Sequence, residues 1–125
     1  MRQGVKSFRE LEVYQVAFAF QQEVFRRSKQ WPKEEMYALT DQARRCTRSV
    51  GAAIAESWGK RRYPAHFLSK LTDADSENQE SQHWIDTAEA CEYITEDEAN
   101  AWFAQTESIG RLLGSMMAKH ESFCR

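Results

Sequence analysis

Glu80 and His83, in the stretch ESQH, have the spacing of a metal-ligand pair on one face of a helix. Di-metal carboxylate centres in four-helix bundles use two such Glu-x-x-His pairs and two further glutamates. The second pair is missing here, because His66 and His120 have no glutamate three residues earlier. Additional carboxylates could come from Glu23 and Glu56. We therefore expect no metal and no cofactor, and a metal-dependent carboxylate enzyme stays as the alternative interpretation.

Signatures of other catalytic classes are missing from the sequence. It has no nucleophile elbow, no glycine-rich phosphate loop and no zinc-type spacing of Cys and His. Its three cysteines, Cys46, Cys91 and Cys124, are an odd number and lie far apart. This spacing argues against a disulfide framework and favours a reducing compartment. The sequence predicts a protein that is not an enzyme.

The stretch RRCTRSVGAAIAESWGKRR, residues 44–62, gathers positive charge in a chain whose net charge is −2. Its basic residues are Arg44, Arg45, Arg48, Lys60, Arg61 and Arg62. The planar guanidinium of arginine can pair bidentately with a carboxylate or a phosphate. Three interpretations stay open: solvated charge, a contact with acidic side chains of a neighbouring subunit, and binding to RNA or DNA phosphates. For the third, we expect the six residues to form one positive surface without base-specific contacts.

Charge is also divided along the chain. Residues 1–70 carry 14 Lys and Arg against 7 Asp and Glu, whereas residues 71–125 carry 3 against 12. Such an asymmetry predicts a binding partner or the association of opposite faces of neighbouring copies.

Four helical segments must position these residues. Apolar residues recur with helical spacing over residues 8–29, 33–58, 64–93 and 96–119. Two capping boxes indicate helix starts, Ser7 with Glu10 and Thr95 with Glu98. No stretch alternates with the period of a strand. Long helices with short connections predict one all-α domain over residues 1–125, an up-down-up-down left-handed four-helix bundle.

The first two segments carry different apolar surfaces. The first has two adjacent stripes, Leu11, Tyr14, Phe18, Gln21 and Phe25 beside Val13, Ala17, Phe20 and Val24. The second has a seam of mostly small residues, Met36, Leu39, Ala43, Cys46, Val50, Ala53 and Ser57. Two stripes make a wider apolar face than the core of a monomeric bundle usually buries. We therefore expect a homo-oligomer.

The stretches SFRELEVYQVA, WPKEEMYALTDQARRCTRSVGAAIAES and ESQHWIDTAEACEYI resemble a family of small bacterial four-helix-bundle proteins. This family is known from open reading frames in intervening sequences of 23S ribosomal RNA genes, and its relatives include the accessory protein of diversity-generating retroelements. The resemblance covers nearly the whole chain and is most specific from Trp31 to Glu56. Its signature includes Gln42, Ile54 and Glu56. The chain departs from the family's usual Asn and Gly at Ala53 and Ser57.

The resemblance implies a left-handed bundle assembled as a ring of five subunits, with no established enzymatic activity. The retroelement relatives associate with nucleic acid and a reverse transcriptase. For Glu56 we expect a structural role, in an ion pair or a hydrogen bond at a helix end. The N-terminal MRQGVKSF lacks the apolar region of a secretory signal, and no apolar run reaches the roughly 20 residues of a membrane helix. We expect a cytoplasmic protein without a membrane partner.

Overall fold

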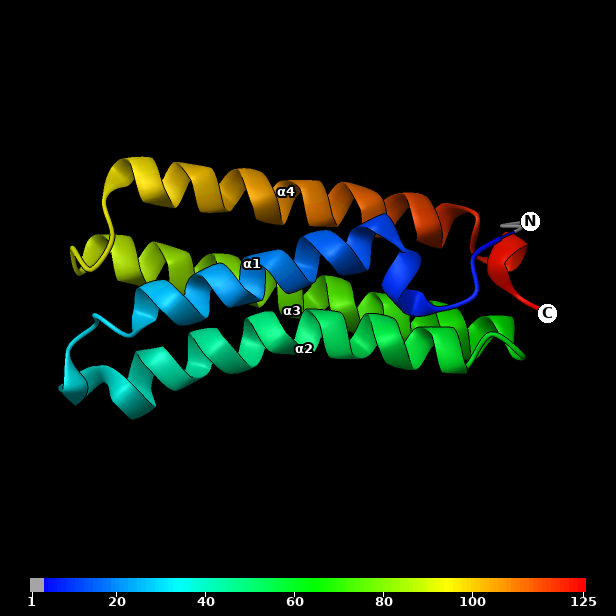
Figure 1. Cartoon of the computed structure of the whole chain (residues 1–125), viewed down its shortest axis with the longest axis horizontal. Coiled ribbons are helices and arrows are strands. Elements are labelled where there is room, and N and C mark those ends of the chain that lie inside the picture. Colours follow the sequence, from blue (N-terminus) through cyan, green and yellow to red (C-terminus); the bar gives the residue numbers. More distant parts are fainter. Residues whose placement is uncertain (1–3) are drawn as a thin grey trace.

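The computed structural model describes residues 4–125, which form four long helices joined by short connections. They are α1 (Glu12–Ser28), α2 (Asp41–Gly59), α3 (Pro64–Ala90) and α4 (Glu96–Ala118). The chain reverses direction after each helix, so that α1 and α3 run opposite to α2 and α4 (Figure 1). Consecutive helices pack against each other, and α1 also packs against α4, which closes the bundle. The predicted all-α four-helix bundle is confirmed.

Short helices of other types precede or follow the long ones. The 3-10 helices are η1 (Phe8–Glu10), η2 (Lys33–Glu35) and η4 (His120–Phe123), and η3 (Met36–Thr40) is a π-helix. The predicted first and second segments therefore begin with η1 and η2, while α1 and α2 begin only at Glu12 and Asp41. Within residues 4–125 there is no strand, and no helix is long and apolar enough to cross a membrane.

The start of the first segment differs from the predicted capping box. Ser7 Oγ accepts a hydrogen bond from the Arg9 backbone N–H at 3.2 Å, and the Glu10 carboxylate accepts one from the Lys6 N–H at 3.2 Å. These bonds satisfy one backbone donor within η1, a single 3-10 turn, and one just before it, and Leu11 then returns to extended geometry before α1 begins. The residues that resemble a helix cap thus stabilise a turn instead of the α-helix.

The core lies between the four helices, and of the two stripes predicted for the first segment only one is buried along its whole length. Val13, Ala17, Phe20 and Val24 are buried. The other stripe starts in the core at Leu11 and then passes along the surface, where Phe18 is 45% exposed. Most of the small-residue seam of the second segment is buried, as predicted. Small side chains let a neighbouring helix approach closely, and α2 packs closely against α3.

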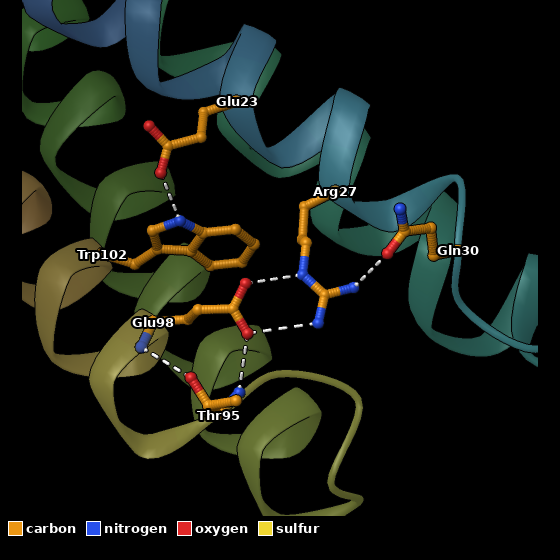
Figure 2. A network of polar contacts seen from close by, with 6 residues as sticks. All are labelled: Glu23, Arg27, Gln30, Thr95, Glu98 and Trp102. Carbon is orange, nitrogen blue, oxygen red and sulfur yellow. Dashed lines mark hydrogen bonds and ion pairs between the residues drawn. The ribbon is translucent and has the colours of Figure 1, made fainter.

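A polar network joins the end of α1 to the start of α4 (Figure 2). Thr95 and Glu98 form the predicted capping box: the Glu98 N–H donates to Thr95 Oγ1 at 3.1 Å, and the Thr95 N–H donates to the Glu98 carboxylate at 2.8 Å. Arg27 binds the same carboxylate through Nε at 2.6 Å and Nη2 at 3.1 Å. The cap of α4 therefore also ties α1 in place.

Replacing Glu98 by glutamine should weaken the fold in a pH-dependent way. The Arg27 guanidinium and the Thr95 N–H lower the pKa of Glu98 from 4.5 to about 2. A lowered pKa adds stability above the unfolded-state pKa, and this stability is lost as the pH falls from about 4.5 towards 2. Because the side chain is 34% exposed, solvent screening reduces the contribution to about 1–2 kcal/mol at pH 7.

Urea unfolding of Glu98→Gln and the wild type at several pH values measures this effect. Glutamine can still accept the Thr95 N–H bond, so the substitution removes the charge and keeps the cap. We expect a difference of about 1–2 kcal/mol at pH 7 that shrinks to near zero at about pH 2. An equal difference at both pH values would contradict the assigned role of the charge.

Candidate nucleic-acid interface

The structure divides the six basic residues of the segment 44–62 into two groups. Arg44, Arg45 and Arg48 lie on α2, whereas Lys60, Arg61 and Arg62 lie at its end and in the connection to α3. The twelve residue steps from Arg48 to Lys60 span about 18 Å at the rise of an α-helix. This distance exceeds the Debye length of about 8 Å at physiological salt, so the two groups act as separate charge clusters.

The first group lines an open hollow of about 650 Å³ on the outer side of α2. We call it the arginine hollow; its lining residues are Tyr37, Asp41, Gln42, Arg44, Arg45, Arg48, Ser49 and Ala52. Tyr37 comes from the π-helix η3 and the others come from α2. Two successive elements therefore build this surface, and Asp41 is its only carboxylate.

Contacts with α1 and with α2 itself hold the three arginines in place. Arg44 Nε donates to Ser28 Oγ at 2.8 Å, and its guanidinium lies 4.8 Å from the centre of the Phe25 ring. The Arg48 guanidinium lies 5.1 Å from the same ring. Arg45 donates to the Gln42 side chain, which gives this signature residue a role in the hollow. Stacking on an aromatic face and bonding through one edge leave the other guanidinium N–H groups available to a ligand.

The electrostatics of the arginine hollow favour an anion. None of Arg44, Arg45 and Arg48 forms an ion pair with a carboxylate of residues 4–125. The ion pairs within residues 4–125 involve other basic side chains: Arg27 pairs with Glu98, and Lys70 pairs with Glu56 and Asp73. Three arginine charges thus face an open surface together, without a partner of opposite charge in residues 4–125.

The second group contains an arginine with a structural role. Arg61 Nε donates to the Trp58 carbonyl at 2.8 Å, and its guanidinium lies 3.7 Å from the centre of the Trp58 ring. Burial and then the neighbouring Arg125 lower the pKa of Arg61. Lys60 and Arg62 are exposed. Arg61 therefore stabilises the end of α2, while Lys60 and Arg62 form a smaller exposed cluster.

Two other signature residues have structural environments. Ile54 is fully buried in the core. Glu56 forms an ion pair with Lys70 of α3 at 3.5 Å, in an acidic hollow that is also lined by Asp73 and Glu77. This ion pair fits the structural role that the sequence predicts for Glu56.

The candidate metal ligands bind separate partners. Glu23 accepts hydrogen bonds from Trp102 Nε1 at 2.6 Å and Gln105 Nε2 at 3.4 Å on α4. Glu80 accepts one from Trp84 Nε1 at 3.1 Å, and the exposed His83 ring packs against Trp84. Because Glu56 pairs with Lys70, these residues do not converge on one site.

A different cluster, Cys46 with Glu77 and Glu80, brings potential ligand atoms within 4.8 Å of one another. The Cys46 thiol donates to the Glu77 carbonyl at 3.0 Å and accepts a hydrogen bond from Ser81 Oγ at 3.2 Å. Burial raises the pKa of Cys46 to about 12, so the group is a neutral thiol at pH 7. The helical spacing of Glu77 and Glu80 is visible in the sequence, but their proximity to Cys46 depends on how α2 and α3 pack.

Sequence reasoning missed Tyr37, which lines the arginine hollow, and Phe25, whose ring supports two of its arginines from α1. Tyr37 precedes Asp41, Arg45 and Arg48 by helical steps, which is the signal that could have placed it on the same face. For Phe25 the sequence offers no such signal, since its contact with Arg44 and Arg48 depends on the packing of α1 against α2.

Comparison with known proteins identifies relatives of the chain. Residues 9–115 match the family model described as 23S rRNA-intervening sequence protein. A solved structure from Bacteroides thetaiotaomicron, described as a protein of unknown function from the S23 ribosomal protein family, is similar with a TM-score of 0.76. It shares 24% sequence identity, and the match covers 85% of this chain and 95% of that one. At this identity the likeness shows the fold alone. No curated protein matches the chain.

Proposed function

This chain belongs to the 23S rRNA-intervening sequence protein family, and we propose that it is a non-catalytic helical scaffold that binds nucleic acid by its phosphate backbone. The site is the arginine hollow, with Arg44, Arg45 and Arg48 as the phosphate-binding residues. The proposal rests above all on one observation, that these three arginines surround one open hollow and form no ion pair with residues 4–125.

Arginine is suited to this role because its fixed fork can bind two phosphate oxygens at once. Phe25 and Gln42 hold the guanidinium groups before a ligand arrives, which lowers the entropy lost on binding. The hollow offers charge and few base-reading groups, so binding should depend little on sequence. The unpaired cysteines fit a cytoplasmic location, where nucleic acid is accessible.

Fluorescence anisotropy with a labelled RNA oligonucleotide tests the proposal. Each neutralised phosphate on a single strand steepens the log–log salt dependence by about 0.7, so three arginines give a slope of about −2 per hollow. We expect measurable binding at about 50 mM salt that weakens with this slope. Failure to bind RNA or DNA at that salt concentration, where such contacts are strong, would contradict the proposal.

We also propose that the scaffold is a homo-oligomer, and the family resemblance implies five subunits. The supporting surface is the exposed stripe of α1, where Phe18 lies between the half-buried Tyr14 and Phe25. Tyr14 lies beside α2 at Gly51, 3.6 Å from where a Cβ on that glycine would stand. A second copy would cover this apolar surface, and the ring would repeat the arginine hollow on each subunit.

Phe18→Glu should dissociate the oligomer, because it places a charge in the middle of the apolar stripe. Size exclusion with light scattering at micromolar concentration should give a pentamer for the wild type and a 14.6 kDa monomer for the variant. Tyr63→Glu is the matched control, because Tyr63 is also an exposed aromatic but caps the start of α3, outside the stripe of α1. A monomeric wild type would rule out the oligomer.

A further inference from the structure

Tyr37 is an exposed aromatic residue at the edge of the arginine hollow. Its side chain is 82% exposed, the highest value among the exposed large apolar residues of the part that the structure describes. It lies on η3, a π-helix, which is a rare element that often occurs at functional sites. An aromatic ring that contributes so little to the core is available to contact a ligand.

The chemistry of the hollow changes along its length. Tyr37 is followed on the same face by Asp41, then by Arg45 and Arg48, at steps of four, four and three residues. Tyr37 and Arg45 are therefore about two helical turns apart along the axis. One end of the hollow offers an aromatic face and the other end offers guanidinium groups.

The charge of Asp41 influences which part of a nucleic acid can bind at each end of the arginine hollow. The Asp41 carboxylate lies about one turn from both Tyr37 and Arg45. At the Tyr37 end it repels a phosphate, whereas at the other end the charges of Arg45 and Arg48 outweigh it and attract phosphates. A neutral, flat group with hydrogen-bond donors on its edge suits the Tyr37 end, because its face stacks on the ring and its edge faces Asp41 and Gln42. An unpaired nucleobase has these properties.

We propose that the arginine hollow selects single-stranded nucleic acid, with one base stacked on Tyr37 while neighbouring phosphates bind Arg45 and Arg48. This inference rests on the proposed function and specifies its ligand. A duplex can offer its phosphates to the arginines, but its bases are stacked inside and cannot reach Tyr37. Stacking is tolerant of sequence, since every base has a flat aromatic face.

A double-mutant cycle between protein and ligand tests the proposal. The two changes are Tyr37→Ala in the protein and removal of the bases from the oligonucleotide, which keeps every phosphate. For an intact single strand, Tyr37→Ala should lower the affinity about tenfold, or about 1.4 kcal/mol, which lies in the range for one stacked base. For the abasic strand and for a duplex, it should change the affinity less than about twofold.

Two variants serve as controls. Tyr37→Phe keeps the ring and should bind the single strand like the wild type. Tyr63→Ala removes another exposed aromatic residue, one outside the arginine hollow, and should also bind normally. Because Tyr37 is so exposed, its replacement should leave the circular dichroism spectrum and the unfolding temperature unchanged.

The outcomes separate this inference from the proposed function. If Tyr37→Ala binds the intact single strand as well as the wild type does, base stacking is refuted while phosphate binding by the arginines stands. If Tyr37→Ala weakens intact and abasic strands equally, Tyr37 acts on the backbone and the single-strand selectivity is wrong. If the wild type binds no nucleic acid at about 50 mM salt, both the proposed function and this inference fail.

Discussion

Replacing Arg45 and Arg48 together by glutamate should lower the affinity for single-stranded RNA at least about 100-fold at about 50 mM salt. Each charge-assisted hydrogen bond to a phosphate contributes about 1.5 kcal/mol or more, and the two new carboxylates also repel the ligand. Both side chains are exposed, so the bundle should fold normally. Anisotropy titrations with the same labelled RNA measure the change.

The matched control is Lys60→Glu with Arg62→Glu, which makes the same change in net charge on exposed residues near the end of α2. It should weaken binding only slightly, because about 18 Å of helix separates this cluster from Arg48. If both double variants lose affinity equally, binding follows overall charge and the arginine hollow is not the site. If Arg45→Glu with Arg48→Glu breaks the oligomer, these arginines hold subunits together.

Ile54→Ala should lower the free energy of unfolding by about 2–5 kcal/mol, the usual range for a large-to-small change in a core. Ile54 is fully buried in the core between the helices, so little relaxation can fill the cavity. For a chain of this length the loss corresponds to a decrease in Tm of about 10 °C or more. Thermal unfolding at a fixed protein concentration measures it, since oligomers unfold in a concentration-dependent way.

Glu56→Ala, two residues away, is the control for Ile54→Ala. Glu56 is 56% exposed and its ion pair with Lys70 is 3.5 Å long, so its removal should cost less than about 1 kcal/mol. Of these two signature residues, Ile54 would then stabilise the core, whereas Glu56 would contribute only a weak ion pair on the surface. A loss of several kcal/mol for Glu56→Ala would show that this ion pair matters more than its exposure indicates.

The long helices could be predicted because their signals are local. Periodic apolar residues locate all four, and the capping box of Thr95 and Glu98 is present as predicted. The sequence predicts the starts of the first two α-helices too early, because η1 and the η2–η3 stretch have helical spacing but not α-helical hydrogen bonding. The type of helical turn there depends on packing against the rest of the bundle.

The candidate site was only partly predictable for a related reason. The sequence identifies its arginines, because charge clusters are visible in one dimension. It does not show that Arg61 stacks on Trp58 and so differs from its neighbours, or that Phe25 of α1 supports Arg44 and Arg48. These contacts join residues across a turn or between helices. The sequence predicts one positive surface, whereas the structure has two clusters of basic residues. The arginine hollow is the larger, and Lys60 with Arg62 form the smaller.

Arginine-specific chemical modification, measured residue by residue with mass spectrometry, tests the central claim most directly. The protein is modified alone and with a saturating amount of single-stranded RNA at about 50 mM salt. We predict that RNA protects Arg45 and Arg48 but leaves the exposed Arg62 reactive. Unchanged reactivity of Arg45 and Arg48 in the presence of bound RNA, with protection of Arg62 instead, would contradict the arginine hollow as the nucleic-acid site.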